Sequence, residues 1–274
     1  MVENEPRLTR LLKYMKEKER GRAALHVHTT FSDGLKTPGE CLKLAQRVNL
    51  DVLAITDHDK VKGAIEALKE AEKRGIPISV VLGTEATTAQ GHILALFVEE
   101  TGGVPTMLSL KDTVKEVHRQ GGLVVAPHVG VGFSPASIAP ETIRDLYKKG
   151  ERLDGIEILN PHYNQRHVNM ALGLSLEYGI SQIGADDDHF GNLGRGPLTL
   201  FLGKTSADLR RSIEEGETIA IRSAFLPRTI PLGEKIYQIT RGIIKGLPVK
   251  AERAPILILT LISLRLEELN KVMK

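Results

Sequence analysis

The chain is short of several kinds of residue, and each shortage excludes a class of protein. Its 274 residues include one cysteine, Cys41, so an internal disulfide framework cannot form. The longest apolar run, 256–266, is interrupted by polar residues and is shorter than the roughly 20 residues that a membrane span needs. The first 20 residues are charged where a signal peptide would be apolar. We therefore expect a cytoplasmic protein with no membrane partner.

A large excess of one charge is also lacking. Lys and Arg number 37 against 34 Asp and Glu, a formal net charge of +3, with no concentrated block of basic residues. This balance does not by itself indicate nucleic-acid binding, and small anionic ligands remain open. Hydrophobic residues make up 41% of the chain, enough to fill the core of one large α/β domain or two small ones.

Short apolar runs alternate with segments of helical periodicity between residues 23 and 222. This alternation is typical of βα units around a parallel sheet, and no linker or low-complexity stretch interrupts it. The expected strands are 23–28, 52–55, 78–82, 91–97, 123–126, 155–159, 181–184, 198–202 and 218–222, and the expected helices are 38–48, 63–74, 110–120, 140–148, 165–178 and 206–215.

Helical segments are expected on both sides of this region. Residues 1–22 carry leucine and methionine at helical spacing, which predicts an amphipathic helix packed on the main domain, 23–222. Residues 223–274 predict a helical extension of the same domain, with helices at 236–244 and 256–273. The apolar side of the last helix is expected to pack on the domain or on a second copy of the chain, which would form a homo-oligomer.

The first expected strand carries two histidines, His26 and His28. Residues two apart on a strand point to the same face, so both imidazoles can chelate one metal ion. Asp33 follows within a turn and adds a carboxylate, a mixture of donors that suits Zn, Mn or Fe. The alternative is a pair of half-buried strand histidines bonded to their neighbours.

Other metal-binding residue types also fall where expected strands end. Because the carboxyl ends of strands in an α/β barrel meet at one rim, residues far apart in sequence converge there. His118 lies inside an expected helix, where a solvated or structural histidine is the commoner case, whereas His162 and His167 follow a strand end and could line the same pocket. The residues at or just past strand ends are His26, His28, His58, Glu85, His128, Asp187 and His189, and His92 can reach the same mouth.

Four separate motifs carry a resemblance to a known family. They are residues 26–34 (His-Val-His-Thr-Thr-Phe-Ser-Asp-Gly), Thr56-Asp57-His58-Asp59, Pro127-His128, and Asp187-Asp188-His189 followed by Leu193-Gly194-Arg195. In this order they resemble the motifs of the polymerase and histidinol phosphatase (PHP) superfamily of metal-dependent phosphoesterases, with Glu85 and His92 at its intervening ligand positions. The resemblance covers about residues 23–220.

The resemblance implies a distorted (β/α)7 TIM-like barrel with up to three divalent metal ions, Zn, Mn or Fe. It assigns one ion to His26, His28, Glu85 and Asp187, a second to Glu85, His92 and His128, and a third to Asp33, His58 and His189, so that Glu85 bridges the first two. The last motif departs from the family pattern because three aspartates follow one another. The Asp-x-His spacing selects Asp187, and a one-residue bulge would select Asp186 instead.

The activity implied is hydrolysis of phosphomonoesters, or of the terminal phosphate or phosphodiester of nucleotides or short oligonucleotides, by a metal-activated water. Arg195 is expected to clamp the phosphate, with a surface arginine in a glycine-rich loop as the alternative. Asp57, Asp59 and His162 are candidates for protonating the leaving group, and the two aspartates could instead orient His58.

Three readings of this activity remain. A histidinol-phosphatase-type enzyme and a non-catalytic module braced by its metals are the alternatives to a broader phosphoesterase. All the assigned ligand positions hold His, Asp or Glu, which favours an enzyme. Six residues separate Glu85 from His92, and the stretch on to His128 leaves no length for a helical lid, so an open site of low selectivity is expected.

Overall fold

The computed structural model describes residues 20–99, 103–131 and 136–222. The chain divides into two compact units, Met1–Arg228 and Thr229–Lys274, and every described residue belongs to the first. The expected N-terminal helix and the helices of the C-terminal extension lie outside the described residues. No helix in the described ranges is both long enough and apolar enough to cross a membrane.

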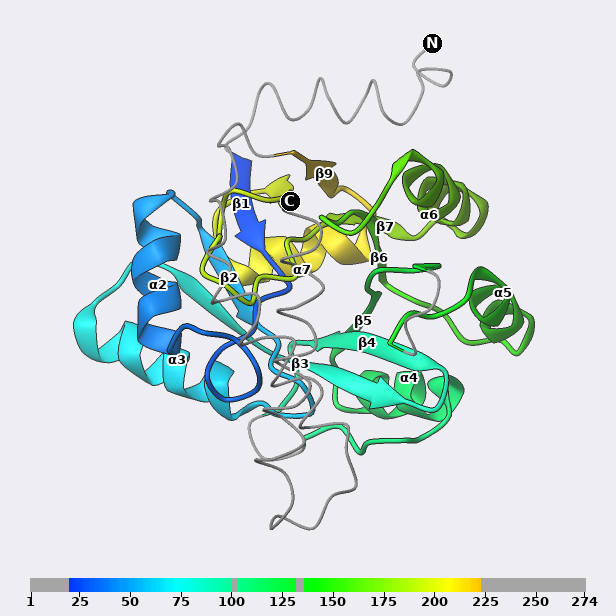
Figure 1. Cartoon of the computed structure of the whole chain (residues 1–274), viewed down its shortest axis with the longest axis horizontal. Coiled ribbons are helices and arrows are strands. Elements are labelled where there is room, and N and C mark those ends of the chain that lie inside the picture. The colour runs from blue at the N-terminus through cyan, green and yellow to red at the C-terminus, as the bar shows by residue number, and fades with distance from the viewer. Residues whose placement is uncertain (1–19, 100–102, 132–135, 223–274) are drawn as a thin grey trace, which may run out of the picture. The chain divides into compact units, whose positions relative to one another are not determined.

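Strands and helices alternate along the first unit as the sequence predicts (Figure 1). The strands are β1 (Arg20–Ala24), β2 (Val52–Ile55), β3 (Ser79–Thr88), β4 (Gly91–Leu96), β5 (Leu123–Ala126), β6 (Gly155–Leu159), β7 (Ser181–Gly184), β8 (Leu198–Leu202) and β9 (Ile219–Ile221). The helices are α2 (Pro38–Arg47), α3 (Lys62–Arg74), α4 (Leu110–Arg119), α5 (Pro140–Lys148), α6 (Gln165–Tyr178) and α7 (Ser206–Glu214).

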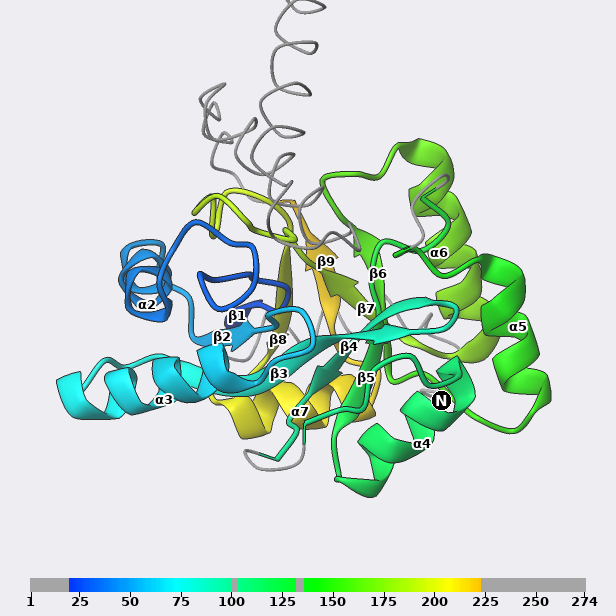
Figure 2. The same ribbon diagram turned by 60° about the horizontal axis from the view of Figure 1, so that its bottom comes forward.

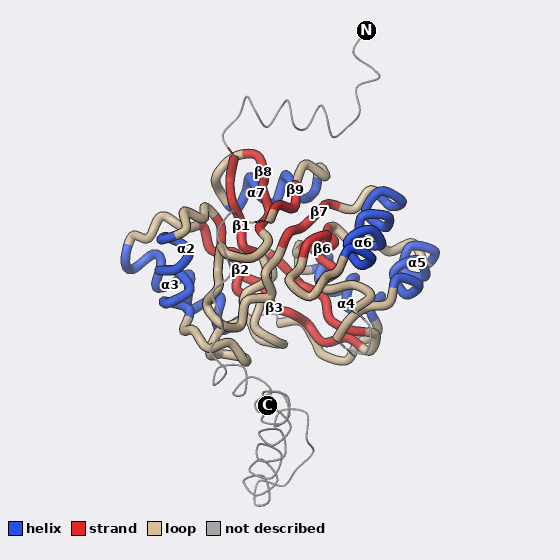
Figure 3. Tube along the Cα trace, turned by 45° about the horizontal axis from the view of Figure 1, so that its top comes forward, coloured by secondary structure: helices blue, strands red, loops and turns tan. Residues whose placement is uncertain are grey.

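The strands form one nearly closed, barrel-like sheet with helices outside it, which confirms the predicted distorted TIM-like barrel (Figure 3). The strand order is β7-β6-β5-β4-β3-β2-β1-β8-β9. The expected parallel pairing holds for β1-β2-β3 and for β5-β6-β7, whereas β4, β8 and β9 run antiparallel to their neighbours. Barrel closure is helped by Thr199 of β8, whose hydroxyl accepts from Gly184 N at 3.1 Å and donates to Gly184 O at 2.9 Å.

Alternation along the strands divides the apolar residues into two clusters. One set, which includes Leu25, Val81, Leu94 and Phe201, fills the barrel interior, and the residues next to them face the outer helices. Helix α7 adds Leu209 and Ile213 to the interior set and lies across one end of the barrel (Figure 2). Ser181, the first residue of β7, donates to Ile213 O, so α7 covers the amino-terminal end of that strand. The opposite end of the barrel, where the parallel strands have their carboxyl ends, is not covered by α7.

Two strands differ from their expected bounds by more than one residue at an end. Strand β1 ends at Ala24 rather than at residue 28, because its regular pairing with β2 ends there; beyond it, Val27 forms an isolated bridge with Asp188, past the end of β7. Strand β3 instead runs on to Thr88, because residues 83–88 leave β2 and pair antiparallel with β4 as a hairpin. Within this hairpin Glu85 pairs with Leu94, two residues from His92 on β4.

Gly184 provides a test of how the barrel closes. A Cβ atom there would lie 2.3 Å from Leu198 O, a backbone atom that cannot move aside. Gly184→Ala is therefore expected to lower the free energy of unfolding by about 1–3 kcal/mol. Gly173→Ala is the matched control, since nothing lies within 4 Å of that position in α6 and alanine favours the helix. Urea unfolding of both variants measures the difference, and equal stabilities would contradict the close β7–β8 approach.

Candidate metal centre

The structure brings all the predicted metal ligands together at the end of the barrel where the parallel strands have their carboxyl ends. His26 and His28 lie just beyond β1, His58 beyond β2, and His128 beyond β5. The remaining members are Asp33, Glu85, His92, Asp187 and His189. Each member of the set has a side-chain nitrogen or oxygen within 3.6 Å of another member.

Glu85 is the centre of this cluster. Its Oε2 lies 3.2 Å from the Nε2 atoms of His26 and His28 and 3.2 Å from Nδ1 of His58. Its Oε1 lies 3.0 Å from Nδ1 of His92 and 2.9 Å from Nε2 of His128. The side chain is 1% exposed, and its two oxygens face two different groups of imidazoles. A carboxylate with this arrangement can bridge two metal ions.

Four donors around His26 and His28 fit one divalent ion. The two Nε2 atoms are 3.1 Å apart, and each lies 3.2 Å from Glu85 Oε2 and from Asp187 Oδ1. Four ligand atoms held about 2.1 Å from one tetrahedral zinc ion would lie about 3.4 Å from one another. The donor set and its spacing therefore suit a metal ion, and they match the predicted first group.

The other two groups differ in membership from the predicted ones. Asp33 lies 3.5 Å from both His58 Nε2 and His189 Nε2, as expected, but Nδ1 of His28 also comes within 3.6 Å of it. His58 uses its other nitrogen toward Glu85, so it groups with Glu85 and His92 as well. Because each imidazole has two nitrogens, sequence spacing could not decide which group each histidine joins.

Charge explains how these side chains tolerate burial. Burial alone would lower the pKa of His28, but its hydrogen bonds to Asp187 and Glu85 outweigh this and raise the pKa to about 10. Burial would likewise raise the pKa of Glu85, but the charge of His26 and the hydrogen bond from His128 hold it well below its usual value. Imidazolium groups thus balance the carboxylates, and divalent ions can take over that role.

Two of the ligands have strained backbones. His128 has φ of 31° and Asp187 has φ of 48°, values that residues other than glycine rarely adopt. Such conformations cost of order 1–3 kcal/mol and occur where the surrounding structure holds a functional group in place. At Asp187 this turn aims the carboxylate at His26 and His28. The neighbouring Asp186 carboxylate instead lies against Gly196, where burial raises its pKa to about 8, so the alternative ligand assignment is not supported.

Glu157 belongs to the site, and the sequence analysis missed it. It is 0% exposed on β6, and its Oε1 accepts a hydrogen bond from Nδ1 of His26 at 2.8 Å. Its Oε2 accepts from the backbone N–H of His128 and from Nδ2 of Asn160, both at 2.8 Å. This orients His26 with Nε2 toward the centre. The signal in the sequence was a lone acidic residue inside an apolar strand, Gly-Ile-Glu-Ile-Leu.

Glu157→Gln is expected to weaken metal binding about 10–100-fold. An amide that keeps its oxygen toward His26 turns its NH2 toward His128 N–H and Asn160, leaving buried donors facing one another. Metal titration monitored by calorimetry measures the effect. Glu141→Gln, at a side chain that is 79% exposed, is the control. Unchanged affinity in the Glu157 variant would show that His26 is oriented by other contacts.

Two of the residues predicted to assist catalysis, Asp57 and Asp59, lie outside the pocket over the metal ligands. Asp57 is fully buried and accepts from Thr29 and from the hydroxyl of Ser32, so it braces the loop after His28 rather than facing a substrate. Asp59 accepts from the backbone and hydroxyl of Thr87. The hydrogen bonds of both carboxylates go to Thr29, Ser32 and Thr87 and not to His58, and neither aspartate lines the pocket over the cluster, so the geometry does not support proton transfer by them.

His162 and Arg195 complete the set of predicted residues. His162 lines the pocket, with Nε2 3.6 Å from Asp187 Oδ2, and its hydrogen bond with that carboxylate raises its pKa. Arg195 is exposed on the loop after His189 and is not among the residues that line the pocket. His118, expected to be solvated or structural, pairs with Asp154. His167, which the sequence analysis placed near the pocket with His162, instead caps α6 and is not among the pocket residues.

The pocket over the cluster is small and open at the rim. It has a volume of about 290 Å³, and its polar lining residues are His58, Glu85, His92, His128, His162, Asp187 and His189. A barrel with a buried set of imidazoles and carboxylates at the carboxyl ends of its strands defines a metal-binding site of the hydrolase type.

Comparison with known proteins identifies the family. The PHP domain model matches residues 24–136. The uncharacterized protein MJ1587 of Methanocaldococcus jannaschii is 34% identical over 160 residues, which is 54% of this chain and 86% of that protein. The 3',5'-nucleoside bisphosphate phosphatase of Chromobacterium violaceum is 34% identical over 119 residues, 42% of this chain and 39% of that enzyme.

A solved structure shares the fold. A two-domain protein of Bacteroides vulgatus, described as containing a predicted PHP-like metal-dependent phosphoesterase, superposes with a TM-score of 0.64 at 23% identity, covering 75% of this chain and 66% of that one. The chain therefore belongs to the PHP domain family.

Proposed function

We propose that this chain hydrolyses phosphomonoesters, or the terminal phosphate or phosphodiester of nucleotides and short oligonucleotides, with up to three divalent ions of Zn, Mn or Fe. The observation that carries the proposal is Glu85, whose two buried oxygens face two separate groups of imidazoles. The name of the bisphosphate phosphatase relative supports a nucleotide as one of the substrates.

The first group of ligands is His26, His28, Glu85 and Asp187; Glu85 with His92 and His128 would hold a second ion; and Asp33, His58 and His189 would hold a third. When bound, the ions would supply positive charge for the phosphate and an activated water. Donor types do not decide among Zn, Mn and Fe.

The chain's own groups provide orientation and a proton. Glu157 fixes the ring of His26, and Asp57 fixes the loop that carries Asp33 through its bond to Ser32. His162 is 60% exposed at the pocket edge and can hold a proton at Nε2, where the charge of Asp187 favours the protonated form. We propose it as the donor to the departing oxygen. Arg195 is proposed to contact substrate outside the pocket, where its exposure leaves it accessible.

Turnover of a panel of phosphoesters tests the proposal. Among the described residues between Glu85 and His128 the only helix is α4, and none of its residues lines the pocket. Few remote contacts are then available to separate one phosphoester from another. We expect metal-dependent activity spread over several nucleotides and sugar phosphates, with kcat/KM varying by less than about 10⁴-fold.

Two outcomes of this assay would contradict the proposal. Absence of turnover on every ester, with metal content verified by elemental analysis, would favour a non-catalytic module. A single ester, such as histidinol phosphate, preferred by more than about 10⁴-fold would indicate a dedicated enzyme with a closed site.

A further inference from the structure

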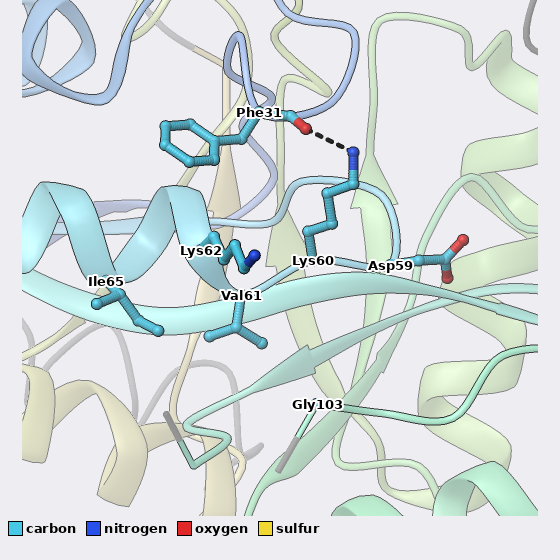
Figure 4. Close-up of a pocket in the computed structure, with 7 residues that line it drawn as sticks. All are labelled: Phe31, Asp59, Lys60, Val61, Lys62, Ile65 and Gly103. Carbon is cyan, nitrogen blue, oxygen red and sulfur yellow. Dashed lines mark hydrogen bonds between the residues drawn. The ribbon is translucent and has the colours of Figure 1, made fainter. Parts of the chain in front are cut away.

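A second cavity lies beside the metal centre and has no role in the chemistry described so far. Its volume is about 410 Å³, larger than the pocket over the metal ligands and within the ~300–1,000 Å³ range of small-molecule sites. We call it the Phe31 cavity; its lining includes Phe31, Asp59, Lys60, Val61, Lys62 and Ile65 (Figure 4).

The cavity has an apolar wall and a positive rim. Phe31, Val61 and Ile65 supply an aromatic ring and two branched aliphatic side chains. Lys60 and Lys62 are exposed, and among the described residues neither has a carboxylate partner in an ion pair. The Asp59 carboxylate is held by Thr87 and points away from Phe31 in Figure 4. An aromatic, anionic ligand suits this combination of groups.

The same two loops build this cavity and the metal centre. Phe31 stands two residues before Asp33, and Lys60 stands two residues after His58, so each pair of Cα atoms is at most about 7.6 Å apart. Asp33 Oδ2 lies 3.5 Å from His58 Nε2, and Lys60 Nζ donates to Phe31 O at 2.9 Å. These two contacts tie the loops together, so a molecule bound at the metal centre has the Phe31 cavity as a neighbour.

We propose that the Phe31 cavity binds the heterocyclic base of a nucleotide whose phosphate is held at the metal centre. The base would stack on Phe31 against Val61 and Ile65, with Lys62 at the rim complementing the negative charge of the nucleotide. This inference rests on the proposed function and deepens it, because it distinguishes nucleotides from sugar phosphates that have no base.

Adenosine and a pair of matched phosphates test this role. AMP and ribose 5-phosphate share sugar and phosphate and differ in the base alone. Replacing an aromatic side chain that stacks on a base by alanine typically weakens binding of that base about tenfold. We expect Phe31→Ala to lower the ratio of kcat/KM for AMP to that for ribose 5-phosphate about tenfold, and Phe31→Leu, which keeps apolar volume, to lower it severalfold. Lys69→Ala, an exposed lysine further along α3, should leave the ratio unchanged.

Binding of adenosine, which has no phosphate, separates this inference from the proposed function. Saturation-transfer NMR should detect adenosine on the wild type and a weaker signal on both Phe31 variants, whose folding is checked by thermal unfolding. If Phe31→Ala does not fold, Phe31→Leu decides. Adenosine binding that depends on Phe31 supports the cavity even if no phosphoester is hydrolysed, in which case only the proposed function fails. Equal adenosine binding by wild type and folded variants, or an unchanged substrate ratio in an active enzyme, overturns the assignment.

Discussion

Replacing Glu85 by glutamine is expected to lower kcat by a factor on the order of 10⁴ or more while leaving the barrel folded. Both oxygens of this carboxylate are used, one toward His26, His28 and His58 and the other toward His92 and His128. An amide offers one oxygen and one NH2 group, and the NH2 group does not coordinate a metal ion. Whichever way the amide turns, one group of imidazoles loses its shared ligand.

The fold should survive this change because the barrel core consists of apolar strand residues rather than of the rim ligands. Circular dichroism checks the fold, elemental analysis counts the retained ions, and steady-state kinetics on AMP gives kcat. Glu141→Gln is again the control for a glutamate-to-glutamine change at an exposed site. Wild-type turnover by a Glu85→Gln enzyme with its full metal content would falsify the bridging role.

Metal removal is expected to have the second largest effect, and its size should depend on pH. An ion present at a thousandfold excess over its dissociation constant stabilises the fold by about 4 kcal/mol. For a domain of this size each kcal/mol shifts the thermal midpoint by about 2–4 °C, so removing one such ion lowers it by roughly 8–16 °C. Turnover should disappear with the ions and return when Mn or Zn is added back.

The pH dependence follows from the imidazoles. In the metal-free protein the pKa of His28 is raised from its ordinary value of 6.5 to about 10, and the pKa values of His26 and His128 are also raised. A raised pKa contributes stability that is fully present below pH 6.5 and is lost as the pH rises toward about 10. The metal-free protein should therefore lose stability across this window. The metal-bound protein should not, because its imidazoles are already neutral ligands.

Differential scanning calorimetry of chelated and metal-loaded protein at about pH 6.5 and about pH 9 measures this difference. The gap between the two midpoints should widen at the higher pH. A gap that stays constant or narrows would mean that protonated imidazoles do not substitute for metal ions in the empty cluster.

Much of the architecture could be predicted from the sequence because it depends on local periodicity. β2, β5, β6, β7 and β8 have the bounds that the apolar runs predicted, since a strand that is buried on both faces is apolar along most of its length. The capping box of Thr37 and Glu40 and the left-handed Gly75 at the end of α3 were readable from residue types alone. The candidate ligands could be proposed for the same reason, because strand ends in a βα barrel share one rim.

Pairing between segments distant in sequence decided the rest. Strand β4 was expected, but its direction was not: it forms an antiparallel hairpin with β3, and the direction of a strand is set by its neighbour and not by its own residues. Contacts between side chains up to 131 residues apart decided two further features of the site. They determine which nitrogen of His58 faces Glu85, and they make Glu157 rather than Asp57 the residue that orients an imidazole.

The sequence by itself therefore determined the order of the elements and the set of chemical groups at the rim, because both follow from periodicity along one strand or helix. Only the tertiary structure decided how those groups combine, and it alone placed Phe31 and Lys60 in a second cavity beside them. The physical reason is that a donor–acceptor contact depends on the orientation of two loops at once, and that orientation is fixed when the sheet closes.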